Sequence, residues 1–175
     1  AVRLWHLLRN NSKRGSKRNI EAHYDLGNDF YRLWLDPTMS YSSGFFDNAG
    51  TDLEAAQLAK YHLVADALAL EAGQDLLEIG CGWGSFAETA AMAGRRVRGL
   101  TLSTEQKAYV DARMASARLD GVEVSLTDYR DVAGQYDAIA SIEMVEAVGE
   151  AYWPAYLGAI ARALKPGGRA EIQYI

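Results

Sequence analysis

The segment Asp75–Gly84, with the sequence DLLEIGCGWG, constrains the fold of this chain more than any other segment does. Its first half is apolar apart from Glu78, which is typical of a buried parallel strand. Glycines alternate with other residues in its second half, and residues 85–93 then have a helix-forming composition. A strand, a glycine turn and a helix in this order predict the ligand-binding unit of a Rossmann-like fold, although such a turn alone is equally consistent with a purely structural role.

The spacing of the glycines bears on the ligand. An acidic residue, Glu78, is separated by one residue from the pattern G-x-G-x-G, whereas dinucleotide-binding units carry G-x-G-x-x-G. The shorter pattern is the S-adenosylmethionine signature of class I methyltransferases. The missing residue suits a ligand that has no pyrophosphate group to cradle.

Strands and helices alternate after the glycine turn. Strands are expected at residues 76–79, 97–102, 122–126, 136–142 and 169–175. Helices are expected at residues 85–93, 103–118 and 153–164, and the last of them is ended by a turn at residues 165–168. This order predicts an α/β fold with a doubly wound, mainly parallel sheet. Because the chain stops within the fifth strand and an open sheet edge is a liability, we expect further C-terminal strands in a longer protein.

Two helices are expected before the glycine turn. Residues 20–36 are rich in aromatic side chains, with Phe30, Leu33 and Trp34 on one helix face. Residues 53–70 follow a cap at Thr51 or Asp52 and carry an apolar face made of Leu58, Ala59, Leu63, Leu68 and Leu70. The chain is therefore divided into a basic segment (1–19), an N-terminal helical cap (20–72) and an incomplete core domain (73–175).

The charge of the chain is unevenly distributed. Within a net charge of −5, the first twenty residues contain no acid and six bases, namely Arg3, Arg9, Lys13, Arg14, Lys17 and Arg18. A basic segment on an acidic body predicts contact with anionic lipid or nucleic acid, or else a solvated linker. No apolar run approaches the roughly 18 residues of a membrane span. The single cysteine, Cys81, excludes an internal disulfide and provides no metal-binding set, so a cytoplasmic protein without a bound metal is expected.

Six sequence blocks carry a more specific resemblance. They are HYDLGNDFYRLWLDPTMSYS (23–42), EAAQLAK (54–60), LEIGCGWG (77–84), GLTLSTEQ (99–106), DYRDV (128–132) and LKPGG (164–168). Together they resemble the cyclopropane-fatty-acyl-phospholipid synthase and mycolic acid cyclopropane synthase family. The resemblance implies methyl transfer from S-adenosylmethionine to the double bond of an unsaturated acyl chain in a phospholipid. It also implies a homo-oligomer on the inner, anionic face of a membrane, with no nucleic-acid partner.

The resemblance implies a set of cofactor-binding residues. Tyr41 and Ser42 would approach the methionine end, and Thr101 and Gln106 would lie near the ribose and methionine. The remaining positions implied are Gly80, Cys81, Gly82, Trp83, Gly84, Leu102, Asp128 and Tyr129. The alternative is that Thr101 and Gln106 are only a strand end and a helix cap.

The family's bicarbonate site is altered in this sequence. By resemblance, Ser43 and Gln173 stand where a cysteine and a histidine are usual, and Ala147 replaces a second histidine, whereas Glu146 and Ile142 are retained. With most of the bicarbonate ligands changed, the product is open between a cyclopropane and a methyl-branched chain, saturated or unsaturated.

Glu143 is an addition, since the cyclopropane-forming relatives carry glycine there. Glu143 and Glu146 are three residues apart, so on a helix they share a face, and two neighbouring carboxylates raise one pKa. Glu143 is thus a candidate base or, alternatively, the cap of a short helix. The rings of Tyr24, Phe30, Phe45 and Phe46 are candidates to shield a cation, although core packing is favoured for Phe30.

Two other functions fit parts of the sequence. A class I methyltransferase that acts on an oxygen or nitrogen of a small molecule would account for the glycine turn, but not for the blocks HYDLGNDFY or YSSGFF. A lipid-binding relative without activity would account for the altered bicarbonate site. Retention of Glu146 and of the cofactor residues argues against the latter.

Overall fold

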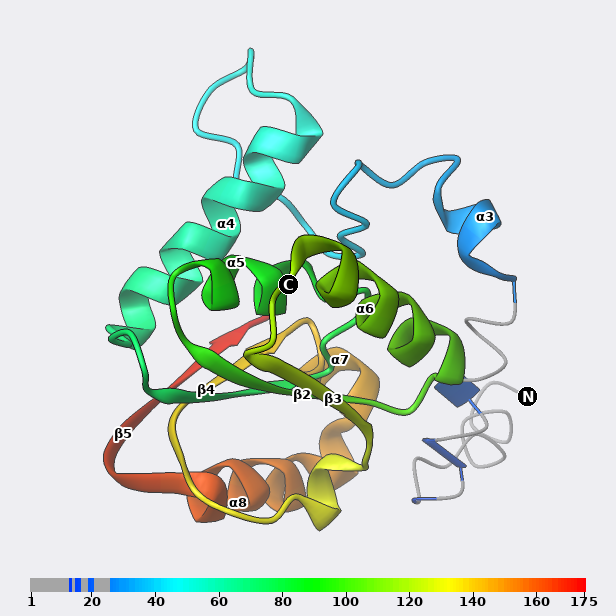
Figure 1. The fold of residues 1–175 in the computed structure, drawn as a ribbon. Helices are drawn as coiled ribbons and strands as arrows, with labels where there is room; N and C mark the ends of the chain where they lie inside the picture. Colours follow the sequence, from blue (N-terminus) through cyan, green and yellow to red (C-terminus); the bar gives the residue numbers. More distant parts are fainter. Residues whose placement is uncertain (1–12, 14, 17–18, 21–25) are drawn as a thin grey trace.

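The computed structural model describes residues 13, 15–16, 19–20 and 26–175, and its centre is a five-stranded parallel sheet (Figure 1). The strands lie in the order β3-β2-β1-β4-β5. Their bounds are β1 Asp75–Ile79, β2 Arg96–Thr101, β3 Val122–Leu126, β4 Tyr136–Ile142 and β5 Leu164–Gln173. The predicted α/β class with a parallel sheet is confirmed.

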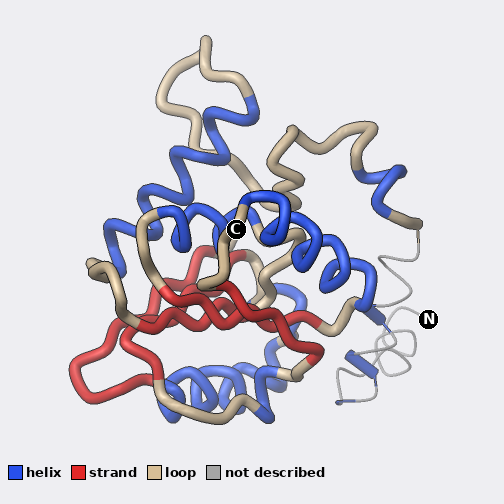
Figure 2. Tube along the Cα trace, in the orientation of Figure 1, coloured by secondary structure: helices blue, strands red, loops and turns tan. Residues whose placement is uncertain are grey.

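Helices cover both faces of the sheet, so the described core has three layers (Figure 2). On one face lie α4 (Leu53–Leu68), α5 (Ser85–Met92) and α6 (Thr104–Ala117), and on the other lies α8 (Trp153–Ala163). Short helices complete the described chain, namely α3 (Asn28–Tyr31), η1 (Tyr129–Asp131), α7 (Val145–Val148) and η2 (Glu150–Tyr152). In the part of the chain that is described, no helix is both long and apolar enough to span a bilayer.

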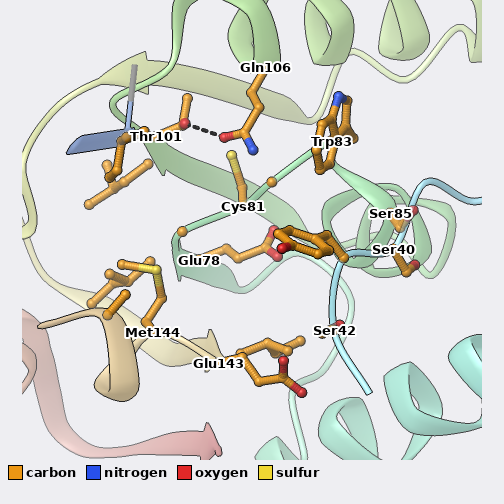
Figure 3. Close-up of a pocket in the computed structure, with 18 of the residues that line it drawn as sticks. Ser40, Ser42, Glu78, Cys81, Trp83, Ser85, Thr101, Gln106, Glu143 and Met144 are labelled. Carbon is orange, nitrogen blue, oxygen red and sulfur yellow. Dashed lines mark hydrogen bonds between the residues drawn. The ribbon is translucent and has the colours of Figure 1, made fainter. Parts of the chain in front are cut away.

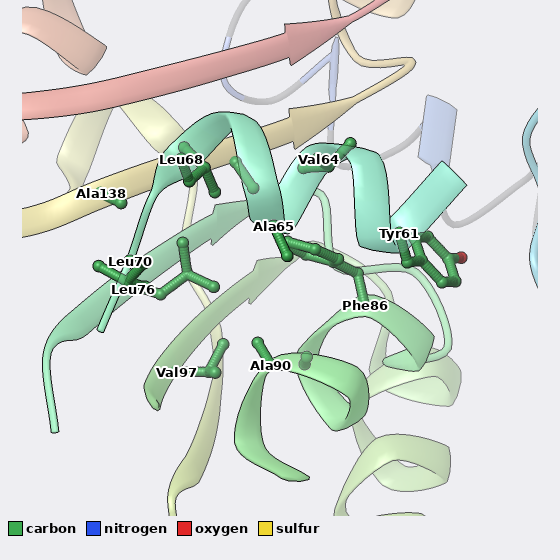
Figure 4. Packing of buried hydrophobic residues seen from close by; sticks show 12 residues of the cluster. Tyr61, Val64, Ala65, Leu68, Leu70, Leu76, Phe86, Ala90, Val97 and Ala138 are labelled. Carbon is green, nitrogen blue, oxygen red and sulfur yellow. The ribbon is translucent and has the colours of Figure 1, made fainter. Parts of the chain in front are cut away.

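The apolar run of β1 serves both layers because side chains alternate across a strand. Leu76 packs with α4 and α5, in a cluster that includes Val64, Leu68 and Phe86 (Figure 4). Leu77 and Ile79 point to the opposite face, against the side of the sheet covered by α8. Burial of each such side chain contributes about 1.5–3 kcal/mol to the stability of the fold. Because β1 packs against helices on both faces of the sheet, it holds the two helical layers together.

The order of the strands also places a ligand site. From β1 the chain continues to β2 on one side, whereas β4 lies on the other side of β1, so the winding direction changes there. In open parallel sheets ligands bind at the carboxyl ends of the strands beside such a switch point. The glycine turn follows β1 at this position.

The predicted helix over residues 20–36 is wrong beyond residue 26. Helix α3 is only four residues long, and Gly27 precedes it with a left-handed φ of 80°, which interrupts a continuous helix. Tyr31 is the buried ring of this segment, whereas Phe30 is 42% exposed, so the core role favoured for Phe30 is also wrong. Tyr31 is buried because it packs on the ring of Trp83, with centroids 4.8 Å apart.

Helix α4 begins as expected but presents a different face. Asp52 is its cap, since the carboxylate accepts a hydrogen bond from Ala55 N at 2.8 Å. Leu58 and Leu63, assigned to the apolar face, are exposed, and Gln57 and Lys60 are buried in the helix's inner surface. These two polar side chains are buried because they hydrogen-bond to Ser42, in the segment between α3 and α4.

Strand β5 begins earlier than predicted. It pairs with β4 from Leu164 onward, and the four residues 165–168 form an irregularity opposite Asp137 before regular pairing resumes at Arg169. A Cβ at Gly168 would lie 2.8 Å from the Asp137 carbonyl oxygen, so the chain needs glycine where the strands approach most closely.

Candidate active site

A cavity of about 740 Å³ lies at the carboxyl ends of β1, β2 and β4 (Figure 3). Its volume is in the range of small-molecule sites. It is lined by all but one of the residues predicted to bind the cofactor, namely Tyr41, Ser42, Gly80, Cys81, Gly82, Trp83, Thr101, Leu102, Gln106, Asp128 and Tyr129.

The glycines of the turn have different structural roles. A Cβ at Gly84 would lie 2.8 Å from Val110 of α6, so Gly84 allows close helix packing and, contrary to the prediction, does not line the cavity. A Cβ at Gly80 would clash with the side chain of Met144. A Cβ at Gly82 would meet nothing within 4 Å, and this residue faces the cavity with a φ of 52°. Gly82 is therefore where a ligand can approach the backbone most closely.

Gln106 offers a hydrogen-bond donor to the cavity. The hydroxyl of Thr101 donates to Gln106 Oε1 at 2.7 Å, which orients the amide so that Nε2 has no partner among the described residues (Figure 3). Gln106 is 3% exposed, and a buried donor without a partner is costly. Thr101 is therefore a residue that orients Gln106, and Nε2 is available for a ligand oxygen.

Glu78, the acid of the glycine motif, is a second unsatisfied group in the cavity wall. Its Oε2 has no partner among the described residues, and the side chain is 3% exposed. Burial raises its pKa to about 8, although the Lys60 ammonium acts in the opposite direction. A ligand with a positive group hydrogen-bonded to this oxygen would favour the ionised carboxylate and lower its pKa.

Aromatic rings line the cavity, but not the ones that were expected. The lining rings are Trp34, Tyr41, Tyr61, Trp83 and Tyr129. Phe30, Phe45 and Phe46 are each at least 42% exposed and are not in the cavity wall, and Tyr24 lies outside the described residues. The indole of Trp83 is fixed from outside, since Nε1 donates to Asn28 Oδ1 at 2.7 Å.

Asp128 is held in place by Arg130. Both carboxylate oxygens of Asp128 accept from the guanidinium, at 2.6 and 2.7 Å, and Oδ1 also accepts from Arg130 N. Burial acts to raise the pKa of Asp128, but these hydrogen bonds outweigh it and hold the pKa below its usual range. The pair fixes η1 and hence the position of Tyr129 in the cavity wall.

Glu143 is the centre of a hydrogen-bond cluster at the end of β4. Its Oε1 accepts from Ser43 N at 2.8 Å, from Ser43 Oγ at 2.7 Å and from Gln173 Nε2 at 3.0 Å. Burial acts to raise the pKa of Glu143, but the bonds from Ser43 and Gln173 and the charge of Lys60 together hold it below its usual range. Glu143 is therefore an ionised carboxylate at neutral pH, and with Ile142 it lines the cavity.

Three expectations for the glutamates are wrong. Glu146 is not among the described residues that line the cavity, and its carboxylate accepts from Ile175 N at 2.7 Å instead. The pKa of Glu143 is lowered rather than raised, because hydrogen-bond donors surround its carboxylate. Nor does Glu143 cap α7, whose preceding residue, Met144, makes no side-chain capping bond.

Gln57 and Lys60 were not recognised as site residues. Gln57 lines the cavity, and Lys60 donates to the hydroxyl of Ser42 from behind the wall. Both belong to the block EAAQLAK, which carried the family resemblance without an assigned role. Polar residues in a block of this kind, one helical turn apart, were the signal that could have found them.

Comparison with known proteins gives consistent results. Residues 11–175 match the family described as mycolic acid cyclopropane synthetase. The tuberculostearic acid methyltransferase UfaA1 of Mycobacterium tuberculosis is 43% identical over an alignment of 172 residues that covers 94% of this chain and 40% of that protein. The cyclopropane-fatty-acyl-phospholipid synthase of Escherichia coli K12 is 42% identical over 85% of this chain and 38% of its own length. The chain thus spans about 40% of these two relatives.

A solved structure has the same fold. The mycolic acid cyclopropane synthase CmaA1, complexed with SAH and CTAB, superposes with a TM-score of 0.84. It is 34% identical, and the match covers 89% of this chain and 55% of the other.

Proposed function

The chain belongs to the mycolic acid cyclopropane synthetase family, and from this we propose that it carries the cofactor half of a lipid methyltransferase. In the proposed reaction a methyl group passes from S-adenosylmethionine to the double bond of an unsaturated fatty acyl chain in a phospholipid. A double bond and an acyl chain require an apolar wall, and the aromatic lining of the cavity supports this choice.

The residues present fit S-adenosylmethionine. The free Nε2 of Gln106 suits a ribose oxygen, the Glu78 carboxyl suits the amino group of the methionine part, and Gly82 leaves room for the ligand beside the backbone. When bound, this cofactor supplies an electrophilic methyl group on a sulfonium. The chain's own contribution is to orient the cofactor and to exclude water from it.

Bicarbonate does not fit the site. By resemblance Ser43 and Gln173 occupy positions of bicarbonate ligands, but in this chain their N–H and O–H donors are bonded to the carboxylate of Glu143. The proposed reaction therefore uses no bicarbonate. The hydrogen-bond cluster around Glu143 is the main support for the product proposed below.

Glu143 is proposed as the base of the reaction. As one carbon of the double bond takes the methyl group, the other becomes a cation, and an ionised carboxylate nearby stabilises it. Glu143 then removes a proton from a neighbouring carbon of the acyl chain, and the electrons of that C–H bond form a new double bond. The proposed product is a methyl-branched alkene. The name of the relative UfaA1, which refers to methyl transfer and not to a cyclopropane, supports this choice.

The chemical structure of the acyl product tests the proposed reaction. The protein is incubated with methyl-labelled S-adenosylmethionine and mixed unsaturated phospholipids, and the acyl product is analysed by proton NMR. A cyclopropane and a methyl-branched alkene have the same mass, but only the cyclopropane has methylene protons upfield of the ordinary chain protons. We expect olefinic signals with a branch methyl and no cyclopropane signals.

Variants of Glu143 complete the test. Glu143→Gln keeps the shape but loses the base, so activity should fall by about 100-fold or more. Glu143→Gly removes the carboxylate, and added acetate should restore part of the activity. Cyclopropane signals from the unaltered protein, or full activity and the same product from Glu143→Gly, would contradict the proposal. Label found only in small molecules would instead favour an oxygen or nitrogen methyltransferase.

A further inference from the structure

Gln57 and Lys60 form a buried polar pair on the inner face of α4. Gln57 is 1% exposed and Lys60 is 5% exposed, and both project toward the segment that carries Ser42 and Ser43. A buried lysine loses its hydration, so its presence needs a structural or functional reason. The pair has no part in the chemistry proposed above.

The hydrogen bonds of the pair run in one direction. Lys60 Nζ donates to Gln57 Oε1, which fixes the amide so that Nε2 is the free donor. Gln57 Nε2 then donates to the Ser42 carbonyl oxygen at 2.6 Å. The N–H of that same peptide unit, Ser43 N, donates to Glu143 Oε1 at 2.8 Å. A continuous chain of donors thus leads from the ammonium through one peptide plane to the carboxylate.

Lys60 also fixes the side chains around this peptide. Its ammonium donates to Ser42 Oγ and lies 4.5 Å from the centre of the Tyr61 ring. The titratable groups that face it are Glu143 just after β4, Glu78 of β1 and Asp36 of the loop between α3 and α4. Burial lowers the pKa of Lys60 to about 8, while these three carboxylates act to raise it, so the ammonium remains mostly protonated at pH 7.

We infer that Gln57 and Lys60 are positioning residues for Glu143, holding the Ser42–Ser43 peptide in line with its carboxylate and supplying the positive charge that faces it. The inference rests on the role proposed for Glu143. Hydrogen bonds in series strengthen one another, and an opposite charge favours the ionised carboxylate. The buried polar face of α4 therefore serves the end of β4, across more than 80 residues of sequence.

The pH dependence of the rate tests the inference. Glu143 must be ionised, so activity is lost as the pH falls through its pKa. Without the Lys60 charge that pKa rises, and we expect Lys60→Met and Lys60→Gln to move the acidic limb of kcat upward by about one pH unit. Gln57→Met keeps the charge and should lower kcat by about tenfold with a much smaller shift of the limb.

A matched control variant and a Glu143 variant distinguish failure of this inference from failure of the proposed function. Lys107→Met removes an exposed lysine paired with Asp111 on α6, and it should leave the limb in place. An unmoved limb in a folded Lys60→Gln protein would overturn the inference. Full activity in Glu143→Gln would instead overturn the proposed function on which it rests. Thermal unfolding and calorimetric cofactor binding establish that each variant is folded, and Lys60→Gln keeps hydrogen-bonding groups in case Lys60→Met does not fold.

Discussion

Gly82 differs from its neighbours in the glycine turn because only the cavity lies beside it. Its φ of 52° is in the left-handed region, and no atom lies within 4 Å of the position of a Cβ. A β-branched residue there would meet both backbone strain and a bound ligand. Strain alone occurs at Gly73, which has a φ of 81° and equally open surroundings, but which is not in the cavity wall.

Gly82→Val should therefore weaken cofactor binding strongly, while the protein remains folded. We expect the affinity for S-adenosylmethionine to fall by tenfold or more, equivalent to about 1.4 kcal/mol, by calorimetry. Gly73→Val is the matched control, since it adds the same side chain at a left-handed glycine outside the cavity. Equal affinities in the two folded variants would show that the turn is structural only.

The surroundings of Glu143 could not be predicted from the sequence. The sequence identifies it as an addition, but its φ of 50° and its bonds to Ser43 and Gln173 follow from the meeting of β4, β5 and the segment before α4. A non-glycine residue in this conformation costs about 1–2 kcal/mol, and such strain concentrates at functional sites. The three-residue spacing to Glu146 predicts a coupled pair only if both residues lie on one helix, whereas Glu143 follows the end of β4 and α7 begins only at Val145.

The strands were predictable because their signals are local. A buried parallel strand such as β1 or β4 reads as a short apolar run, and the bounds of β3 and β4 agree with the prediction. The face of α4 was not predictable from apolar spacing, because the buried side carries Gln57 and Lys60 and leaves Leu63 exposed. Their reason for burial is a contact with Ser42, which only the tertiary structure reveals.

Arg113 of α6 connects elements that the cavity requires together. It pairs with Glu88 of α5, and its Nη1 donates to the Thr38 carbonyl at 2.7 Å and to Ser85 Oγ at 3.0 Å. Thr38 precedes the segment that contributes Tyr41 to the cavity wall. One guanidinium thus links α5, α6 and the loop after α3.

Arg113→Met should loosen this link. Loss of charge-assisted hydrogen bonds in a partly buried position costs about 2 kcal/mol, so the melting temperature should fall by roughly 4–8 °C and cofactor affinity should fall with it. Lys107→Met on the same helix removes an exposed ion pair and should change the free energy of unfolding by less than about 1 kcal/mol. Equal melting temperatures for the two variants, measured by circular dichroism, would contradict this role of Arg113.

The distribution of charge along the chain suggests how the protein reaches a lipid substrate. Residues 21–175 carry 12 bases and 23 acids, so the body of the chain repels an anionic bilayer. The six bases of the first twenty residues could offset this repulsion, although most of them lie outside the described residues. Lys13, which is described, forms an ion pair with Asp131 of η1, so its charge is already partly neutralised within the protein.

The remaining bases of this segment should recruit an anionic membrane. Each contributes about 1 kcal/mol near a charged surface, so replacing Arg14, Lys17 and Arg18 with serine should weaken vesicle binding by about 100-fold at low salt. The difference should shrink as salt rises, because the Debye length falls from about 30 Å at 0.01 M to about 8 Å at 0.15 M. The matched control replaces three exposed bases of the body, Arg118, Arg162 and Arg169, and has the same net charge. If both variants sediment with phosphatidylglycerol vesicles to the same extent, net charge alone governs binding; if neither differs from the unaltered protein, the segment is a linker.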